Sequence, residues 1–426
     1  MAIADRSLDP TYRRISWRLL PFLLVCYLFA YLDRINIGFA KLQMSQDIGI
    51  DDAIYGVGAG IFFLGYVMFE VPSNLLLASI GARLTISRIM VLWGLTSASM
   101  LFVTSATSFY ILRFLVGVFE AGFAPGVLFY LTYWYSPARI GRAMAIFMLA
   151  APIGGVLGGP VSGWIMTALA GTGGLAGWQW MFLLEGLPSI VLGIIVFLTL
   201  DDGPERARWL TSEEKELLRS DLARFPRPGS HSFRAALTDG RVYAMALGYF
   251  CLIAGIYAVS FWLPTILKQG GLDDPLVIGL YSALPYLAAI VAMIGLARRS
   301  DRRNERRWHS AIPAFLGGAA LAVAAVTPTH LGTSLTAITI ATAAIFGSYT
   351  VFWAIPLSYF KGPAAAGGIA FINSIGLVGG FISPVLIGQL KTITGSLEAG
   401  LLSMVVLLVL GGTIIAANRI RPPANL

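Results

Sequence analysis

Twelve long apolar stretches constrain the fold of this chain more than any other feature of its sequence. A helix of about 20 apolar residues spans the ~30 Å hydrocarbon core of a bilayer. Membrane-spanning β-strands would be shorter and would alternate polar with apolar residues, which these stretches do not do. We therefore predict an all-α membrane protein. Its helices are expected at residues 16–43, 54–79, 86–106, 108–136, 139–168, 176–200, 242–268, 277–299, 309–327, 332–357, 364–392 and 396–418.

The basic residues are distributed unequally between the two ends of these helices. If the first helix runs outward, 25 of the 30 Lys and Arg residues fall in segments on the side of the N-terminus. Only Lys41, Lys268 and Lys391 mark the other side, and Arg34 and Arg113 lie within helices. Cytoplasmic loops carry this excess of basic residues. We expect a multi-pass protein of the bacterial inner membrane with both termini in the cytoplasm, and the net charge of +8 does not indicate a nucleic-acid partner.

One polar segment, residues 201–241, divides the chain into six-helix bundles at 1–200 and 242–426. We expect a cytoplasmic linker with a short helix from Thr211 or Ser212, whose apolar side chains could lie on the membrane surface: Trp209, Leu210, Leu217 and Leu218. A weak repeat relates the halves, because a basic turn precedes a Gly-rich stretch ending in proline at both 154–160 and 376–384. Paired Gly/Pro-interrupted segments in two halves are typical of secondary transporters with pseudo-two-fold symmetry.

Four charged residues stand clearly inside predicted helices, namely Asp33, Arg34, Arg113 and Glu120, while Glu70 and Glu185 are borderline cases. A charge at the bilayer centre costs about 2.5–3.5 kcal/mol or more, so such residues usually face a partner or a cavity. At 1.5 Å per residue, Arg34 and Arg113 lie about 10 Å and about 8 Å below the same surface. We expect Asp33, Glu120 and a substrate carboxylate to supply anions between them. Arginine binds carboxylates through two bonds, and a buried carboxyl can carry a proton. The alternative is a static ion-pair network.

Polar residues on other helices are candidates for lining the same site. The set comprises Tyr31, Tyr66, Tyr349, Trp353 and Asn373. Asn373 is a lone amide in an apolar stretch, where it needs hydrogen-bond partners. Tyrosine and tryptophan also gather at membrane interfaces, which is the alternative explanation for the aromatic members of the set.

Several motifs together resemble one family. Y-L-D-R-I-N-I-G-F-A at 31–40, F-E-V-P-S-N-L-L-L at 69–77, R-F-L-V-G-V-F-E-A-G-F-A-P-G at 113–126 and A-A-A-G-G-I-A-F-I-N-S-I-G at 364–376 are similar to the anion:cation symporter branch of the major facilitator superfamily. This branch includes bacterial permeases for tartrate, galactonate, glucarate, phthalate and hydroxyphenylacetate. The resemblance covers all twelve predicted helices.

The resemblance also implies roles for individual residues. Asp33 and Glu120 would couple protons, while Arg34 and Arg113 would bind the anion. Substrate contacts are implied for Tyr31, Tyr66 and Asn373. G-L-A-R-R-S-D-R-R at 295–303 is similar to a conformational latch of the superfamily, with Asp301 and Arg302 in it.

The chain departs from the family pattern at three positions. Ala78 and Ser79 stand where the general motif has Asp and Arg, which predicts a weaker latch there. Leu377 replaces a frequent amide and mildly favours a less polar acid over a polyhydroxy sugar acid.

The sequence thus predicts a transporter that imports a small organic carboxylate with protons by alternating access. The carboxylate would be a sugar acid, a tartrate-like dicarboxylate or an aromatic acid. No cofactor is expected, and a monomer should suffice. An exporter or exchanger of the same fold is the main alternative. An enzyme is not expected, because no metal-ligand or nucleophile constellation is present in the sequence.

Overall fold

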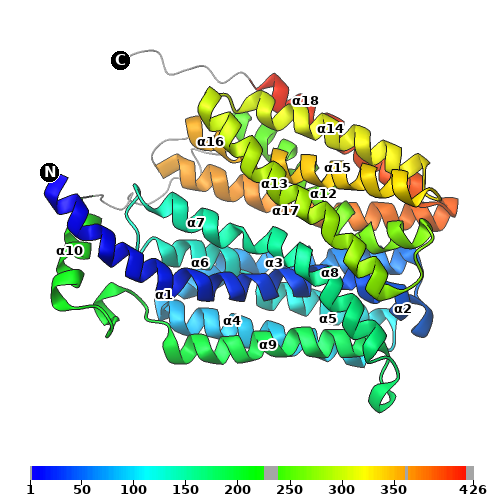
Figure 1. The fold of residues 1–426 in the computed structure, drawn as a ribbon, viewed down its shortest axis with the longest axis horizontal. Helices are drawn as coiled ribbons and strands as arrows, with labels where there is room; N and C mark the ends of the chain where they lie inside the picture. The colour runs from blue at the N-terminus through cyan, green and yellow to red at the C-terminus, as the bar shows by residue number, and fades with distance from the viewer. Residues whose placement is uncertain (1, 225–237, 360–362, 419–426) are drawn as a thin grey trace.

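The computed structural model describes residues 2–224, 238–359 and 363–418, and every regular element within these ranges is helical (Figure 1). The α-helices are α1 (Ala2–Ile35), α2 (Ile37–Asp47), α3 (Asp52–Ile80), α4 (Ala82–Ser99), α5 (Ala106–Glu120), α6 (Phe123–Leu131), α7 (Ile140–Met148), α8 (Ala150–Ala168), α9 (Gly177–Thr199), α10 (Ser212–Ala223), α12 (Gly240–Gln269), α13 (Pro275–Arg303), α14 (Arg307–Val326), α15 (Leu331–Phe352), α16 (Ala354–Tyr359), α17 (Pro363–Thr394) and α18 (Leu397–Ala417).

The described residues form twelve spans that are long and apolar enough to cross a membrane. Four spans combine two consecutive helices each, namely α1 with α2, α5 with α6, α7 with α8, and α15 with α16. The predicted fold class, an all-α membrane protein with twelve transmembrane helices, is therefore confirmed. The linker helix is also present, because Thr211 and Glu214 form a capping box at the start of α10.

The helices are arranged in two groups that meet along a seam. Figure 1 shows α1–α9 in the lower part of the view and α12–α18 in the upper part. Helix α4 packs on α9 and α3 on α5 in the first group, while α12 packs on α17 and α14 on α15 in the second. Across the seam, α8 contacts α13 and α3 contacts α17. The exact domain boundaries at 200 and 242 stay a prediction.

Glycines allow the two groups to approach closely toward one end of the bundle. We call this the distal end; it contains α2 and the turns at residues 48–51, 270–274 and 395–396. A Cβ added at Gly159 in α8 would lie 2.6 Å from the carbonyl oxygen of Gly279 in α13. A Cβ at Gly60 in α3 would lie 2.7 Å from the carbonyl oxygen of Phe381 in α17. Small residues permit this backbone approach in membrane bundles, and here they close the seam at the distal end.

The linker helix packs on protein, which contradicts part of the prediction. Leu210 and Leu218 are buried in the core cluster that includes the first turns of α1 and the end of α6. The Trp209 ring stacks on Trp134 with 5.6 Å between centroids. The expectation that these apolar side chains lie on the membrane surface is therefore wrong. The packing of these apolar side chains holds residues 201–223 against the first group of helices.

We expect Tyr12→Phe to loosen this attachment. The Tyr12 hydroxyl donates a buried 2.7 Å hydrogen bond to Asp221 Oδ2, and its loss should lower the free energy of unfolding by about 1–2 kcal/mol. Thermal unfolding of the purified protein should then shift downward by about 2 °C. Arg206→Gln is the control, because its ion pair with Asp202 is at the surface, with the Arg206 side chain 76% exposed. Equal Tm values for wild type and Tyr12→Phe would contradict the prediction.

Candidate functional site

Arg34, in the last turn of α1, joins three helices near the seam. One of its Nη atoms forms an ion pair with Glu120 at the end of α5. The other donates a 3.0 Å hydrogen bond to the hydroxyl of Tyr257 in α12. Both charged side chains are buried, with 9% of Arg34 and 1% of Glu120 exposed. Arg34 therefore links the two groups of helices through a desolvated ion pair and a polar contact.

A break in the fourth span determines where Glu120 lies. Helix α5 ends at Glu120, Ala121 has an extended ψ of 129°, and Gly122 adopts a left-handed φ of 87° before α6 begins. Glycine adopts such a φ without the steric cost that a side chain would add. Gly122 also lies against Ser73 of α3, since an added Cβ would be 2.6 Å from Ser73 Oγ. The chain direction thus changes immediately after the carboxylate that pairs with Arg34.

One aromatic ring brings the two intramembrane arginines together. The guanidinium carbons of Arg34 and Arg113 both lie 5.2 Å from the centroid of the Phe62 ring. The Tyr66 ring is 5.4 Å from Arg34. Arg113 donates to the backbone carbonyls of Gly58 at 3.3 Å and Ala59 at 3.5 Å. Among the described residues, Glu120 is the one carboxylate recorded in an ion pair with these two guanidiniums. Arg113 therefore lies at this centre without a carboxylate partner among the described residues.

Asp33 does not join this cluster. Its Oδ2 accepts hydrogen bonds from Trp93 Nε1 at 2.6 Å and Ser189 Oγ at 3.2 Å, and its Oδ1 accepts one from Ser97 Oγ at 2.9 Å. The prediction that Asp33 lies between the arginines is wrong. Successive residues on an α-helix point about 100° apart, so Asp33 faces α4 and α9 while Arg34 faces the seam.

A second polar contact crosses the seam between α3 and α17. Asn373 Nδ2 donates a 3.0 Å hydrogen bond to Glu70 Oε1, and Glu70 is buried. The sequence indicated that the Asn373 amide needs a partner, and the structure identifies it as a carboxylate of the other group. Tyr66, whose ring contacts Arg34, and Glu70 are one turn apart on α3. The two side chains therefore lie on the same face of that helix.

The remaining aromatic candidates lie elsewhere. Tyr31 is buried and faces α8, where an added Cβ at Gly154 would be 3.1 Å from its ring. Tyr349 and Trp353 surround Tyr249 of α12, at 6.0 Å and 4.8 Å between ring centroids. Tyr249 precedes Tyr257 by about two turns of α12, so this aromatic group lies along the same helix as the hydrogen-bond partner of Arg34.

The comparisons with known proteins agree with this arrangement. The Major Facilitator Superfamily model matches residues 23–384. The chain belongs to the Major Facilitator Superfamily. An Agrobacterium vitis protein named "Putative tartrate transporter" is 49% identical over 91% of this chain and 87% of its own length. The "Quinolone resistance transporter" of Acinetobacter baumannii is 40% identical over 94% of this chain and 92% of its own length.

A solved structure supports the superfamily fold independently. The crystal structure of a bacterial homologue of the human lysosomal transporter Spinster superposes with a TM-score of 0.77 at 17% identity, covering 94% of this chain and 96% of that one. Proteins of the Major Facilitator Superfamily are membrane transporters and not enzymes. The identities to bacterial relatives are consistent with the anion branch that the motifs resemble.

The residues predicted to form the superfamily latch, Asp301 and Arg302, lie at the end of α13. Asp301 forms an ion pair with Arg306, which stands in the turn that follows α13. Arg302 is exposed at the end of the helix. The assignment of Asp301 and Arg302 to a conformational latch stays a prediction.

Three contributors were not predicted as site residues. Phe62 and Tyr257 were not singled out, and nothing in the local sequence distinguishes them from other aromatic residues in apolar helices. Glu185 was noted only as a borderline intramembrane charge. Its carboxylate accepts hydrogen bonds from Asn36 Nδ2 at 2.9 Å and Ser162 Oγ at 2.7 Å. The sequence did carry a signal for the contact between Asn36 and Glu185, because each of these polar residues stands in an otherwise apolar stretch.

Proposed function

We propose that this protein is a secondary active transporter that imports a small organic carboxylate by proton symport. The observation that carries the proposal is the buried Arg113 guanidinium, which lies against Phe62 and has no carboxylate partner among the described residues. Arg34 and Arg113 lie at the same ring, and Glu120 is the carboxylate paired with them in the described structure. A substrate carboxylate would balance the second guanidinium. The name of the Agrobacterium vitis relative supports this substrate class.

The chemistry of the cluster suits an acid anion better than a neutral solute. A guanidinium grips a carboxylate through two parallel charge-assisted hydrogen bonds. Removing water from such charges is costly unless each charge is paired. Arg34 already has a carboxylate partner, whereas the hydrogen bonds of Arg113 among the described residues reach backbone carbonyls at 3.3 Å and 3.5 Å. Arg113 is therefore the arginine that an anion would stabilise more. Tyr66 and Asn373 are near enough to the same face to contact the rest of the substrate.

Proton coupling would follow from competition for Arg34. When a substrate carboxylate takes over the Arg34 guanidinium, Glu120 loses its counter-ion in a buried place, and protonation removes the cost of that uncompensated charge. Proton and substrate would then cross together as a complex of low net charge. Asp33, held by three neutral donors, is the second proposed proton carrier.

The closed seam suggests the direction from which the site is reached. The excess of basic residues on the side of the N-terminus supports an orientation with the distal end outside the cell and both termini in the cytoplasm of a bacterium. Glycine contacts close the seam at that outer end. The structure would therefore represent a state closed to the outside, and transport would require the bundles 1–200 and 242–426 to rock about the centre. The chain is proposed to work as a monomer without a cofactor.

We expect Glu120→Gln to separate binding from coupling. Glutamine keeps the size and hydrogen-bonding capacity of the side chain but cannot gain or lose a proton. In proteoliposomes, exchange of labelled for unlabelled substrate should persist, while accumulation driven by an inward pH gradient should fall by about tenfold or more. Glu213→Gln, in the first turn of the exposed linker helix, is the control and should accumulate normally. Accumulation by Glu120→Gln at the wild-type level would refute the assignment.

An exporter or exchanger of the same fold is the second candidate. The relative from Acinetobacter baumannii carries the name of a drug-resistance transporter, which motivates this alternative. Reversing the pH gradient across proteoliposomes distinguishes the two. A symporter accumulates substrate only when the outside is acidic, whereas a proton antiporter loads vesicles only when their interior is acidic.

A further inference from the structure

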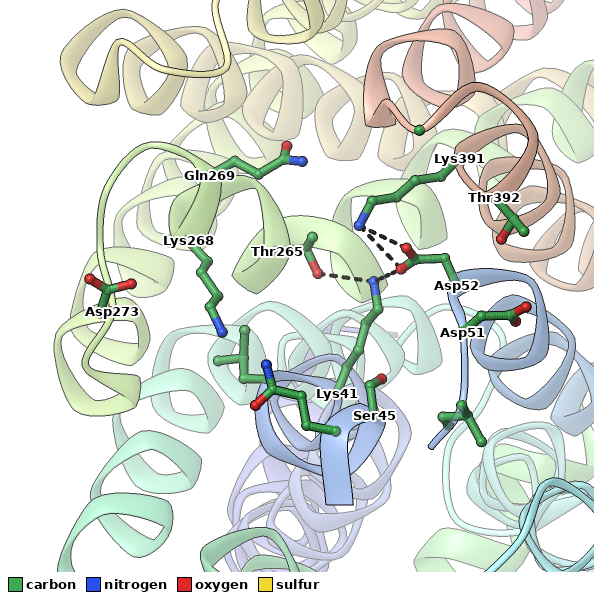
Figure 2. Close-up of a pocket in the computed structure, with 14 residues that line it drawn as sticks. Lys41, Ser45, Asp51, Asp52, Thr265, Lys268, Gln269, Asp273, Lys391 and Thr392 are labelled. Carbon is green, nitrogen blue, oxygen red and sulfur yellow. Dashed lines mark hydrogen bonds and ion pairs between the residues drawn. The ribbon is translucent and has the colours of Figure 1, made fainter. Parts of the chain in front are cut away.

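A pocket at the distal end gathers the three lysines that the sequence places on the outer side. Lys41, Lys268 and Lys391 all line a cavity of about 630 Å³ at the seam, although they stand on α2, α12 and α17. Cavities of about 300–1,000 Å³ are typical of small-molecule sites. Figure 2 shows the lysines entering this space from different walls.

Two of these ammonium groups share a single carboxylate. Lys41 Nζ lies 2.5 Å from Asp52 Oδ1, and Lys391 Nζ lies 3.0 Å from Asp52 Oδ2 (Figure 2). Both ammonium groups also lie over the Trp262 ring, at 3.8 Å and 5.7 Å from its centroid. Two positive charges are thus held close together and only one negative charge compensates them.

The pocket as a whole is lined by three lysines and three aspartates, and neither Asp51 nor Asp273 is ion-paired with Lys41 or Lys391 among the described residues. Asp51 Oδ1 caps α3 by accepting a 2.7 Å hydrogen bond from the backbone of Ile54. Asp273 stands on the far side of the pocket, beyond Lys268 in Figure 2. Lys41 is nearly buried, with 7% of its side chain exposed, and its further recorded hydrogen bond reaches Thr265 Oγ1 at 3.5 Å. The cluster around Asp52 therefore holds two ammonium groups against one carboxylate and retains ammonium donors for a further acceptor.

We propose that this pocket is a second, outer anion-binding site, in which Lys41 and Lys391 hold a small carboxylate that arrives from outside the cell. The proposal rests on the carboxylate transport proposed above and adds a site to it. A carboxylate placed between the two ammonium groups neutralises the excess charge and accepts their spare hydrogen bonds. Lys268 supplies a third ammonium group on the wall of the pocket.

The experiment separates the outer site from the central one by working in the Arg34→Gln background. Binding of tartrate, succinate and benzoate is measured by calorimetry on the purified protein in nanodiscs at low ionic strength. At least one acid should still bind to Arg34→Gln. Adding Lys391→Gln should raise its Kd about tenfold or more, which corresponds to about 1.4 kcal/mol. Lys391→Arg should retain binding, and Lys215→Gln, on the linker helix, is the matched control without effect.

Asp52→Asn distinguishes an anion site from a merely structural ion pair. Removing the shared carboxylate leaves both ammonium groups free, so anion binding should become several-fold tighter. A purely structural role for the cluster predicts that Asp52→Asn and Lys391→Gln act in the same direction, and that result would overturn the proposal.

The remaining outcomes are equally decisive. If wild type binds an acid and Arg34→Gln binds none, the outer site is refuted while the proposed function stands. If Arg34→Gln binds as wild type does and Lys391→Gln abolishes binding, the outer site stands and the central assignment fails. If neither protein binds any of the three acids, both proposals fail.

Discussion

Replacing Arg34 with Gln should abolish transport and raise the substrate Kd at the central site by about 30-fold or more. The side chain contributes a desolvated ion pair with Glu120 and a hydrogen bond to Tyr257. Truncating one partner of a buried, hydrogen-bonded charge pair costs about 2–5 kcal/mol, or roughly 30-fold to several thousand-fold in affinity. The variant also leaves Glu120 buried without its counter-ion, so a lower Tm without ligand is expected as well.

A thermal-shift panel measures this effect directly. Tartrate, aldonates, aldarates, phthalate, hydroxyphenylacetate and their uncharged analogues are added to wild type and to Arg34→Gln. A ligand present at 100 times its Kd stabilises the folded protein by about 2.7 kcal/mol. An acid that stabilises wild type alone identifies the substrate class. Arg14→Gln is the control, because its ion pair with Glu214 lies at the surface, with the Arg14 side chain 50% exposed. An equal response of Arg34→Gln would make the central charges structural.

Replacing Gly279 with Val should prevent closure of the distal seam and abolish transport. A Cβ at Gly279 would overlap the backbone carbonyl of Gly159 in α8, where neither atom belongs to a flexible side chain. Overpacking a close contact typically costs about 1–3 kcal/mol and displaces the backbone. The bundles would separate at this end, so the conformational equilibrium should shift toward the state open at the distal end. Cysteine pairs placed across α8 and α13 should then lose disulfide cross-linking.

Gly295→Val is the matched control for this prediction. Gly295 lies on the same helix, α13, and a Cβ added there meets no atom within 4 Å. The two variants therefore share a residue change and a helix but differ in the steric overlap. Transport should survive in Gly295→Val. Active Gly279→Val with normal cross-linking would show that the seam tolerates the added side chain.

The helices were predictable because each depends on local hydropathy. All twelve expected spans are present, and the Thr211 capping box marks the linker helix as expected. The orientation of side chains on those helices was less predictable. The depth of each residue along its helix axis correctly grouped Arg34 with Arg113. Depth does not say in which direction a side chain points around that axis, so Asp33 was wrongly expected between the two arginines. The same limit affects Tyr31, whose ring packs against Gly154 of α8.

The sequence by itself determined the number of spans and the charged residues that stand within them. Hydrophobic length carries that information residue by residue. Only the tertiary structure decided which partners meet. Tyr257 reaches Arg34 from 223 positions away, and Asp52 joins Lys41 to Lys391 across the seam. Such pairings depend on how two bundles rotate and pack against each other, and no local pattern encodes that packing.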